Sequence, residues 1–408
     1  MNVGLVGRTV ALAAVLAVSW SCGPANHGTA ERHQSVVPTR VVVDMRGAAV
    51  RVPEALTRVA TISDGLVEAV MSRLGVIRSL VALGSISQQR TWSYTYPAAG
   101  GRSYALADGL GTMRALHPWL AELPCAAGSG GEAVNYETIA SAHPEVVIVR
   151  AGDCTLGTSP DVVTRTVAVF EDMGVPTVVL RSPTDYRGRG LETMREEIRV
   201  LGRLFAKESE ASALADELAA WEATIASRVG GVPDAERPRA LYLGLGSAAR
   251  GSGGAGLVWG IDTAESWLLE RVAGARNAYR GAGARALLNA EQLLALDPDV
   301  IFLPTQAGYH PPRELAEAPY FRELRRLRAV QQGRVFPLSW SPMYCAARLE
   351  YPIDLLIVAK GAYPDRFRDM AVSQWALDVY RRLYHVDEAQ ARLLRRSQWL
   401  EWTVETGF

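Results

Sequence analysis

Aromatic, arginine and acidic side chains recur where short apolar runs of the sequence end. Rings of this kind cover the apolar faces of a large ligand, and guanidinium groups pair with its carboxylates. Tyr and His side chains can also bind iron directly, as in haem sites. The set therefore favours a large, flat, anionic chelate as ligand, and it comprises Asp64, Arg90, Trp92, Tyr94, Arg150, Arg181, Arg250, Tyr309, His310, Trp340, Tyr344 and Arg348.

Each of these residues also has a plainer interpretation. A single Tyr or His in a loop more often packs on its own lobe than binds a metal, and His310 precedes two prolines in a stiff turn. Cys154, Cys345 and Met343 have the side chains of a soft-metal site, which ranks below a disulfide or inert thiols. The Gly-rich stretch 246–256 lacks the Lys-Ser/Thr of a Walker loop.

The elements that must position these residues are strands and helices in alternation from Val41 onward. Predicted strands include RVATI (58–62), EVVIV (145–149), TVVL (177–180) and VIFLP (300–304). This alternation predicts an α/β fold with parallel sheets covered on both faces. Ligands bind beyond the carboxyl ends of strands in such sheets, which is where the residues above lie.

One sequence motif occurs twice in the chain. NYETIASAHPEVVIV, Asn135 to Val149, matches NAEQLLALDPDVIFL, Asn289 to Leu303, with Asn first, Glu third, Pro tenth and an acid eleventh. The constant offset between matched residues exceeds the period of a solenoid, which is about 20–50 residues. Each copy is predicted to be a helix, a turn and a strand, so the repeat indicates two similar Rossmann-like lobes.

A long segment without breakers, Gly190 to Val229, separates the two copies and has apolar residues at helical spacing. It is predicted as one long backbone helix, with a joint near Ala206–Ser209 as the alternative. The predicted organisation is a signal peptide at 1–22, a tether at 23–40, an N-terminal lobe at 41–188, the linking helix at 189–230 and a C-terminal lobe with closing helices at 231–408.

The N-terminus predicts export. Arg8 precedes an apolar run that is too short to span a bilayer, as in a secretory signal. Cys22 follows this run, where bacterial lipoproteins are cleaved and lipidated; an ordinary signal peptide cut near 25–30 is the alternative. Export implies an oxidising compartment, in which Cys125 and Cys154 form one candidate disulfide and Cys345 is left over. Spacing alone does not settle the pairing.

Charge excludes some partners. Lys plus Arg and Asp plus Glu both number 43, so no overall field attracts nucleic acid or an acidic partner. Nucleic-acid binding is not expected, and membrane contact is expected only through a lipid on Cys22.

The order and spacing of several segments resemble the class III substrate-binding proteins of ABC importers, which serve ferric siderophores, haem, cobalamin and related metal compounds. The opening 41–85, both copies of the repeat and VQQGRVFPLS (330–339) carry the resemblance. It implies a monomer of two lobes joined by one helix, with the ligand in the cleft between them and no cofactor of its own. Glu137 and Glu291 match the family's surface glutamates, which meet arginine pockets on the permease subunits. A first-turn Glu that favours the helix dipole is the simpler alternative for each.

Three functions compete. The resemblance favours a periplasmic or envelope protein that delivers an iron–siderophore, haem or corrinoid-like chelate to a permease. The same fold binding a small oxyanion such as molybdate is the second. A secreted hydrolase or metalloenzyme is the third, although the sequence has neither a G-x-S-x-G elbow nor an H-E-x-x-H motif.

Overall fold

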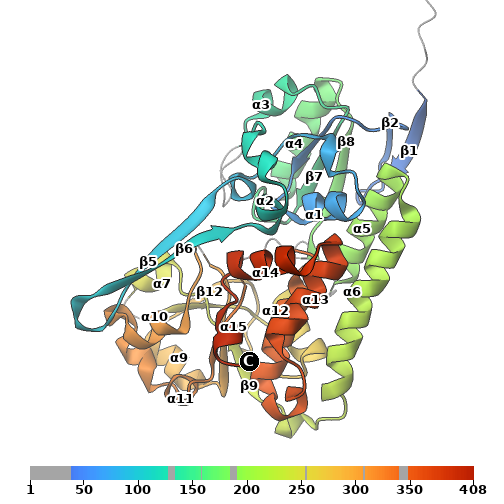
Figure 1. The fold of residues 1–408 in the computed structure, drawn as a ribbon. Helices are drawn as coiled ribbons and strands as arrows, with labels where there is room; N and C mark the ends of the chain where they lie inside the picture. The colour runs from blue at the N-terminus through green and yellow to red at the C-terminus, as the bar shows by residue number, and fades with distance from the viewer. Residues whose placement is uncertain are drawn as a thin grey trace, which may run out of the picture. The chain divides into compact units, whose positions relative to one another are not determined.

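Two four-stranded parallel sheets organise the chain (Figure 1). The computed structural model describes residues 38–126, 134–157, 159–183, 191–252, 255–306, 308–339 and 348–408. The first sheet has the order β4 (Leu80–Ala82), β3 (Val59–Ile62), β7 (Val146–Ala151) and β8 (Thr177–Arg181). The second has the order β11 (Arg276–Asn277), β9 (Arg239–Tyr242), β13 (Val300–Leu303) and β14 (Val335–Pro337). The predicted α/β fold with two similar lobes is confirmed.

The repeated stretch occupies equivalent places in the two sheets. Helix α3 (Tyr136–Ser141) leads into β7, and helix α9 (Ala290–Leu296) leads into β13. The side chain of Asn135 accepts the N–H of Thr138 at 3.1 Å, and that of Asn289 accepts the N–H of Gln292 at 2.9 Å. Each Asn therefore caps its helix as the sequence predicts.

The central strands of the two sheets, β7 and β13, also direct their side chains in the same way. In β7, Val146 and Ile148 belong to the largest hydrophobic core, whereas Val147 and Val149 face a separate outer core. In β13 the matching residues divide in the same way, with Val300 and Phe302 in the largest core and Ile301 and Leu303 in a second outer core. Both central strands are thus covered on both faces, which explains their continuous apolar runs.

The segment between the lobes is not a single helix, so that prediction is wrong and its alternative is confirmed. Helix α5 (Glu192–Phe205) ends at Ala206, which has a left-handed backbone with φ 52°, and helix α6 (Glu208–Val229) begins two residues later. The two helices lie side by side (Figure 1). Helix α6 alone, with 22 residues, spans about 33 Å at 1.5 Å per residue.

Small side chains permit this reversal. A Cβ added to Gly202 would lie 2.5 Å from the Cβ of Ala211, so only glycine allows α5 and α6 to approach this closely. The backbone N–H of Lys207 donates to the carbonyl of Gly202 at 2.8 Å and closes the end of α5. Apolar residues keep their helical spacing through the joint, and for this reason the sequence pattern resembles that of one helix.

Three antiparallel strand pairs, of which the first two are hairpins, complete the strands of the described residues. They are β1 (Thr39–Val43) with β2 (Ala49–Pro53), β5 (Thr91–Pro97) with β6 (Ser103–Leu110), and β10 (Gly256–Val258) with β12 (Ala286–Leu288). The β5–β6 hairpin follows the first sheet's β4 in sequence but contacts helix α10 (Pro312–Glu317), which follows β13 (Figure 1). The β5–β6 hairpin, which belongs to the N-terminal lobe in sequence, therefore contacts the C-terminal lobe.

Helices cover the sheets and close the chain. The helices not yet mentioned are α1 (Leu66–Arg73), α2 (Thr112–Leu116), α4 (Pro160–Asp172), α7 (Ser247–Gly251), α8 (Ala264–Trp267), α11 (Arg328–Gln331), α12 (Tyr351–Ala362), α13 (Val372–Tyr384), α14 (Glu388–Ser397) and α15 (Trp402–Glu405). The closing helix α14 packs on α2 and β6, so the C-terminus of the chain reaches elements of the N-terminal lobe.

Candidate functional site

Polar residues at the ends of β3 and β4 form one buried network. The carboxylate of Asp64 accepts the hydroxyl of Ser85 at 2.8 Å and that of Ser87. Arg348 donates from Nε to the carbonyl of Asp64 at 2.9 Å, and its Nη2 lies 3.6 Å from Oδ1 of the same residue. Arg348 precedes α12, whereas Asp64 follows β3. This ion pair therefore joins the predicted site residues of the two halves.

The predicted cation Arg150 lies within β7, near its carboxyl end, and is internal. Arg150 is fully buried, and its Nε and Nη2 donate to the two carboxylate oxygens of Glu197 at 2.6 and 2.9 Å. Glu197 lies on α5, so the ion pair fastens that helix to the sheet. The guanidinium thus has a bidentate carboxylate partner within the protein, which the sequence pattern did not reveal.

Two buried carboxyls that interact with Asp64 have raised pKa values. Burial raises the pKa of Asp153 to about 7 and raises the pKa of Glu68 above its usual range. Asp153 accepts the backbone N–H groups of Asp64 and Thr155, both at 2.8 Å. The network therefore holds the turn after β7 against the turn after β3.

The β5–β6 hairpin supplies a row of aromatic rings. Trp92 and Tyr94 stack with centroids 6.4 Å apart, and Tyr96 stacks on Tyr104 at 5.2 Å. The hydroxyl of Tyr96 donates to the carbonyl of Tyr309, which follows β13. Trp92 and Tyr94 were predicted as site residues. Tyr104 was missed, although aromatic residues at alternate positions around a Gly-Gly turn are typical of a hairpin with one ring-bearing face.

One ring of this cluster comes from the far end of the chain. The indole of Trp399, after α14, lies edge-on to Tyr94 at 5.8 Å and contacts Tyr309 at 5.0 Å. Tyr94, Tyr309 and Trp399 thus form a continuous aromatic cluster from three distant segments. Sequence reasoning missed Trp399 because no motif links it to either predicted sheet.

Beyond β13, His310 is buried rather than exposed. Its Nδ1 lies 2.8 Å from Oε2 of Glu314, and its Nε2 lies 2.9 Å from the carbonyl of Gln306. Oε1 of Glu314 pairs with Nη2 of Arg250 at 2.7 Å and accepts the hydroxyl of Tyr320 at 2.9 Å. Both ring nitrogens of His310 face oxygen acceptors, so neither is directed at a bound metal.

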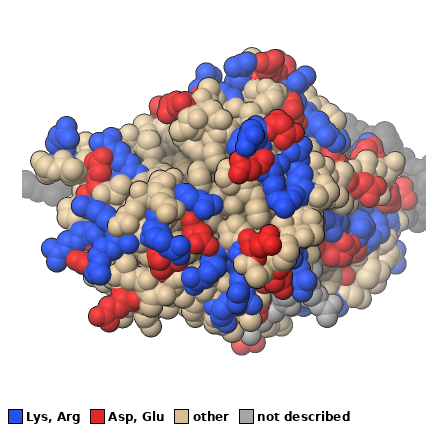
Figure 2. All heavy atoms as spheres, turned by 90° about the horizontal axis from the view of Figure 1, so that it is seen from below, with Lys and Arg blue, Asp and Glu red and all other residues tan. Residues whose placement is uncertain are grey.

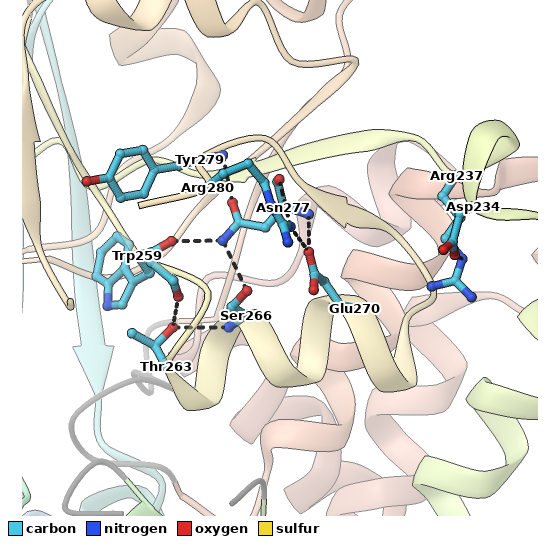
Figure 3. Close-up of polar contacts among 10 residues, drawn as sticks. Asp234, Arg237, Trp259, Thr263, Ser266, Glu270, Asn277, Tyr279 and Arg280 are labelled. Atoms are coloured by element: carbon cyan, nitrogen blue, oxygen red, sulfur yellow. Dashed lines mark hydrogen bonds and ion pairs between the residues drawn. The ribbon is translucent and has the colours of Figure 1, made fainter. Parts of the chain in front are cut away.

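Asn277 on β11 holds the segments on either side of it in place through its side-chain amide (Figure 3). Its amide nitrogen donates to the carbonyl of Trp259 at 2.8 Å and to Oγ of Ser266 at 3.1 Å. Its amide oxygen accepts the N–H of Tyr279 at 3.0 Å. The buried indole of Trp259 lies against Gly244, where an added Cβ would be 3.1 Å from it. This network joins the segment after β10 to β11, the strand that pairs with β9.

The remaining predicted site residues differ in exposure, and some of them lie outside the described residues. Arg90 is exposed, and Arg181 at the end of β8 is half-buried. Trp340, Tyr344 and the lipidation candidate Cys22 lie outside the described residues, as do Met343 and Cys345. No three His, Cys, Asp or Glu side chains among the described residues are arranged to hold a metal ion.

The predicted Cys125–Cys154 disulfide is wrong. Cys154 is disulfide-bonded, but Cys125 is not part of that bond. Cys125 forms a backbone bridge to Leu83 next to β4, and β3 separates β4 from β7, which Cys154 follows. Strands about 4.8 Å apart place the two cysteines on well-separated parts of the sheet, and a disulfide needs Cα atoms within about 7 Å.

Glu137 and Glu291 occupy matched, exposed places in the first turns of α3 and α9. Neither carboxylate has an ion-pair or hydrogen-bond partner among the described residues. Glu137 lines a shallow surface cavity of about 360 Å³ beside the start of α3. Both charges are therefore available to a partner.

An arginine clamp holds the helix that carries Glu137. The backbone N–H of Arg58 donates to Oε2 of Glu145 at 3.0 Å. The guanidinium of Arg58 donates to the carbonyl of His143 at 2.9 Å and to that of Ala142. The clamp joins the end of α3 to the start of β3.

The second lobe repeats this clamp. The N–H of Arg239 donates to Oδ2 of Asp299 at 2.8 Å, and its Nη2 donates to the carbonyl of Leu296 at 2.6 Å. This explains the acid at the eleventh place of the repeat, since Glu145 and Asp299 each anchor the Arg that closes the helix. Glu137 and Glu291 thus lie on helices that are fixed in the same way.

Charged side chains of both signs are mixed on the described surface. Basic and acidic side chains lie side by side over the described part of the face in Figure 2.

Among the described residues, none of the helices combines the length and the apolar character that a bilayer crossing requires.

Two α/β lobes with matched strand order, strand-end polar networks and the helical hairpin of α5 and α6 between them define the class of two-lobed binding proteins. The chain belongs to the periplasmic binding protein family, whose model matches residues 110–339. It is a periplasmic solute-binding protein of the kind that serves ABC transporters.

Solved structures agree with this fold. A periplasmic solute-binding protein of Veillonella parvula DSM 2008 is 20% identical, with a TM-score of 0.65, covering 91% of this chain and 100% of its own. The molybdate-binding protein of Haemophilus influenzae is 17% identical, with a TM-score of 0.63, covering 85% and 98%. A haem-binding protein of Pseudomonas aeruginosa is 20% identical, with a TM-score of 0.53, covering 76% and 94%. Comparison by sequence with curated proteins gives no match.

Proposed function

We propose that this protein captures a metal chelate, such as a ferric siderophore, haem or a corrinoid-like compound, between its lobes and delivers it to the permease of an ABC importer. The observation that supports this most directly is the aromatic cluster of Trp92, Tyr94, Tyr309 and Trp399. The part-exposed rings of Trp92, Tyr94 and Trp399 offer apolar surface to a large ligand, and the buried ring of Tyr309 packs behind them. The structural neighbours include proteins named for haem, molybdate and nickel with histidine.

The arginines favour a chelate over a small oxyanion. A protein that binds a bare oxyanion directs unneutralised donors at it. Here Arg150 is paired with Glu197 and Arg250 with Glu314. Two of the predicted cations are therefore already neutralised by carboxylates, which would repel a second anion.

The raised pKa values of two tyrosines favour contact with the ligand through aromatic rings rather than through phenolate oxygens. Burial raises the pKa of Tyr94 and of Tyr309 above the usual range. Burial therefore makes ionisation of both phenols harder than in an exposed tyrosine, which disfavours their binding iron as tyrosinates. In the proposal, the part-exposed ring of Tyr94 contacts the apolar face of the chelate, and buried Tyr309 supports it from behind.

Delivery rests on the glutamate pair. We propose that Glu137 and Glu291 meet basic pockets on the two permease subunits, and that a lipid on Cys22 keeps the protein at the membrane. Support comes from the exposure of both carboxylates and from the repeated arginine clamps. Two charges on rigidly held helices define one docking orientation.

Calorimetric titration of the purified mature protein tests the ligand class. The probes are haemin, a ferric tris-catecholate, cyanocobalamin and molybdate. We expect saturable binding of at least one chelate, no chemical conversion of it and no binding of molybdate. Binding of molybdate alone would establish the oxyanion alternative, and conversion of a probe would establish an enzyme.

A further inference from the structure

The turn that follows α14 has an unfavourable backbone at its aromatic residue. Trp399 has φ 52°, in the left-handed region that bulky side chains rarely adopt. Such a conformation costs on the order of 1–3 kcal/mol and persists where the surroundings fix it. The contacts of this residue should therefore explain why the turn is kept.

Those contacts fasten the turn to the β5–β6 hairpin. The indole Nε1 of Trp399 donates to the carbonyl of Ala107 at 2.8 Å. The neighbouring Gln398 donates from Nε2 to the carbonyl of Leu110 at 2.6 Å. A Cβ added to Gly109 would lie 2.5 Å from the indole ring, so a glycine is needed where the ring crosses β6.

The same indole contacts both lobes of the candidate site. Its ring lies 5.8 Å from that of Tyr94, at an interplanar angle of 70°, and 5.0 Å from that of Tyr309. The hydroxyl of Tyr309 donates to the carbonyl of Trp399 at 3.3 Å. Tyr94 comes from the hairpin after β4 and Tyr309 from the segment after β13, so Trp399 links them.

We propose that Trp399 is a positioning residue of the ligand site, which holds the part-exposed ring of Tyr94 against buried Tyr309 and so preorganises an aromatic wall for the chelate. This inference rests on the proposed function. Without the indole, the two tyrosines lose a shared neighbour and the hairpin loses a hydrogen bond. Binding must then order rings that the intact protein already holds in place, and such ordering lowers affinity.

The C-terminal helices offer a matched control. Trp375 on α13 is also half-buried and also donates its indole N–H to a carbonyl, that of Pro352, at 2.9 Å. Its partner and its helix differ from those of Trp399. The variant Trp375→Ala therefore removes a comparable side chain without touching the aromatic cluster.

Calorimetry with the three chelates and hydrogen exchange of the ligand-free protein test the role. We expect Trp399→Ala to weaken binding of the chelate that the wild type binds by about tenfold. Trp399→Phe should restore most of the affinity, and Trp375→Ala should change it by less than about twofold. Amides of the β5–β6 hairpin should exchange faster in Trp399→Ala than in Trp375→Ala.

Two results would overturn the inference. One is unchanged affinity and unchanged hairpin exchange in Trp399→Ala, and the other is an equal loss of affinity in Trp375→Ala. If no chelate binds the wild type, the proposed function fails. Hairpin exchange then decides the positioning role separately, because it is measured without ligand.

Discussion

At the scale of single residues, the strand ends hold paired charges rather than bare ones. Arg150 pairs with Glu197, Arg250 with Glu314, and Arg348 with Asp64. These pairs fasten α5 to β7, α7 to α10, and the segment before α12 to the turn after β3. Cationic residues chosen from the sequence as ligand contacts therefore have a structural role first, and aromatic residues carry the case for a ligand.

The pair of Arg150 and Glu197 gives a sharp test of this distinction. We expect Arg150→Met to destabilise the fold by about 3–5 kcal/mol, because it leaves a buried carboxylate without its partner. Replacing both residues with Met should recover much of the loss. Chemical denaturation measures both effects. A variant Arg150→Met of normal stability that no longer binds the chelate would instead assign Arg150 to the ligand.

Buried carboxyls should make stability depend on pH. Burial raises the pKa of Asp354 to about 7, and Asp354 accepts the N–H of Ser339 at 2.8 Å. The folded chain therefore holds this proton more tightly than the unfolded chain. The stabilisation is present at acidic pH and is lost as pH rises through about 7.

For this reason, the free energy of unfolding of the wild type relative to Asp354→Asn should rise by about 1.4 kcal/mol between pH 8 and pH 6. Asp365→Asn, at an exposed carboxylate, serves as the control and should show no such trend. Urea denaturation at several pH values measures the difference. A constant difference across this range would contradict the assignment.

At the scale of elements, a helix–turn–strand unit is used twice and a helical hairpin joins the two copies. The repeated acid, Glu145 or Asp299, anchors an Arg that in turn closes the preceding helix. The hairpin of α5 and α6 depends on Gly202 and Ala211 at its closest approach. Short side chains therefore decide how the linking segment folds back.

Substitutions at the joint test this packing. Gly202→Ala should destabilise the protein by about 1–3 kcal/mol, because overpacking outweighs the gain of about 1 kcal/mol in helix propensity. Ala206→Gly should stabilise it by about 1 kcal/mol, since glycine adopts a left-handed backbone without penalty. Urea denaturation measures both. Stabilisation by Gly202→Ala would show that α5 and α6 do not pack as described.

At the scale of the whole molecule, one hydrophobic core runs through both lobes. It contains residues of β7, α6, α12 and β13, among them Ile148, Leu218, Leu355 and Phe302. The closing helix α14 and the β5–β6 hairpin add contacts between sequence-distant parts. This continuity fixes where the outward-facing helices α3 and α9 present their glutamates.

Charge reversal tests docking at this scale. Uptake of the bound chelate by cells that carry Glu137→Arg and Glu291→Arg should fall by about tenfold or more, because both permease contacts become repulsive. Chelate affinity should stay within about twofold of the wild type. The control reverses two other exposed acids, Glu122 and Glu236. Normal uptake by the first variant, or an equal loss in the control, would contradict the docking role.

The sequence by itself determined the local units of this protein. Apolar runs, helix caps and turn residues act over a few positions, so Asn135 and Asn289 predicted their helices and the repeat predicted two α/β lobes. Family membership agrees with this interpretation because the same segments carry both.

Tertiary structure alone decided which side chains meet. The partners of Arg150 and His310, the reversal at Ala206, the bonding of Cys154 without Cys125, and the placement of Trp399 against Tyr94 and Tyr309 all depend on contacts between distant segments. No local pattern encodes such contacts, because they arise when separate elements pack. Segments hundreds of residues apart therefore build the aromatic cluster that the strand-end residues alone predicted only in part.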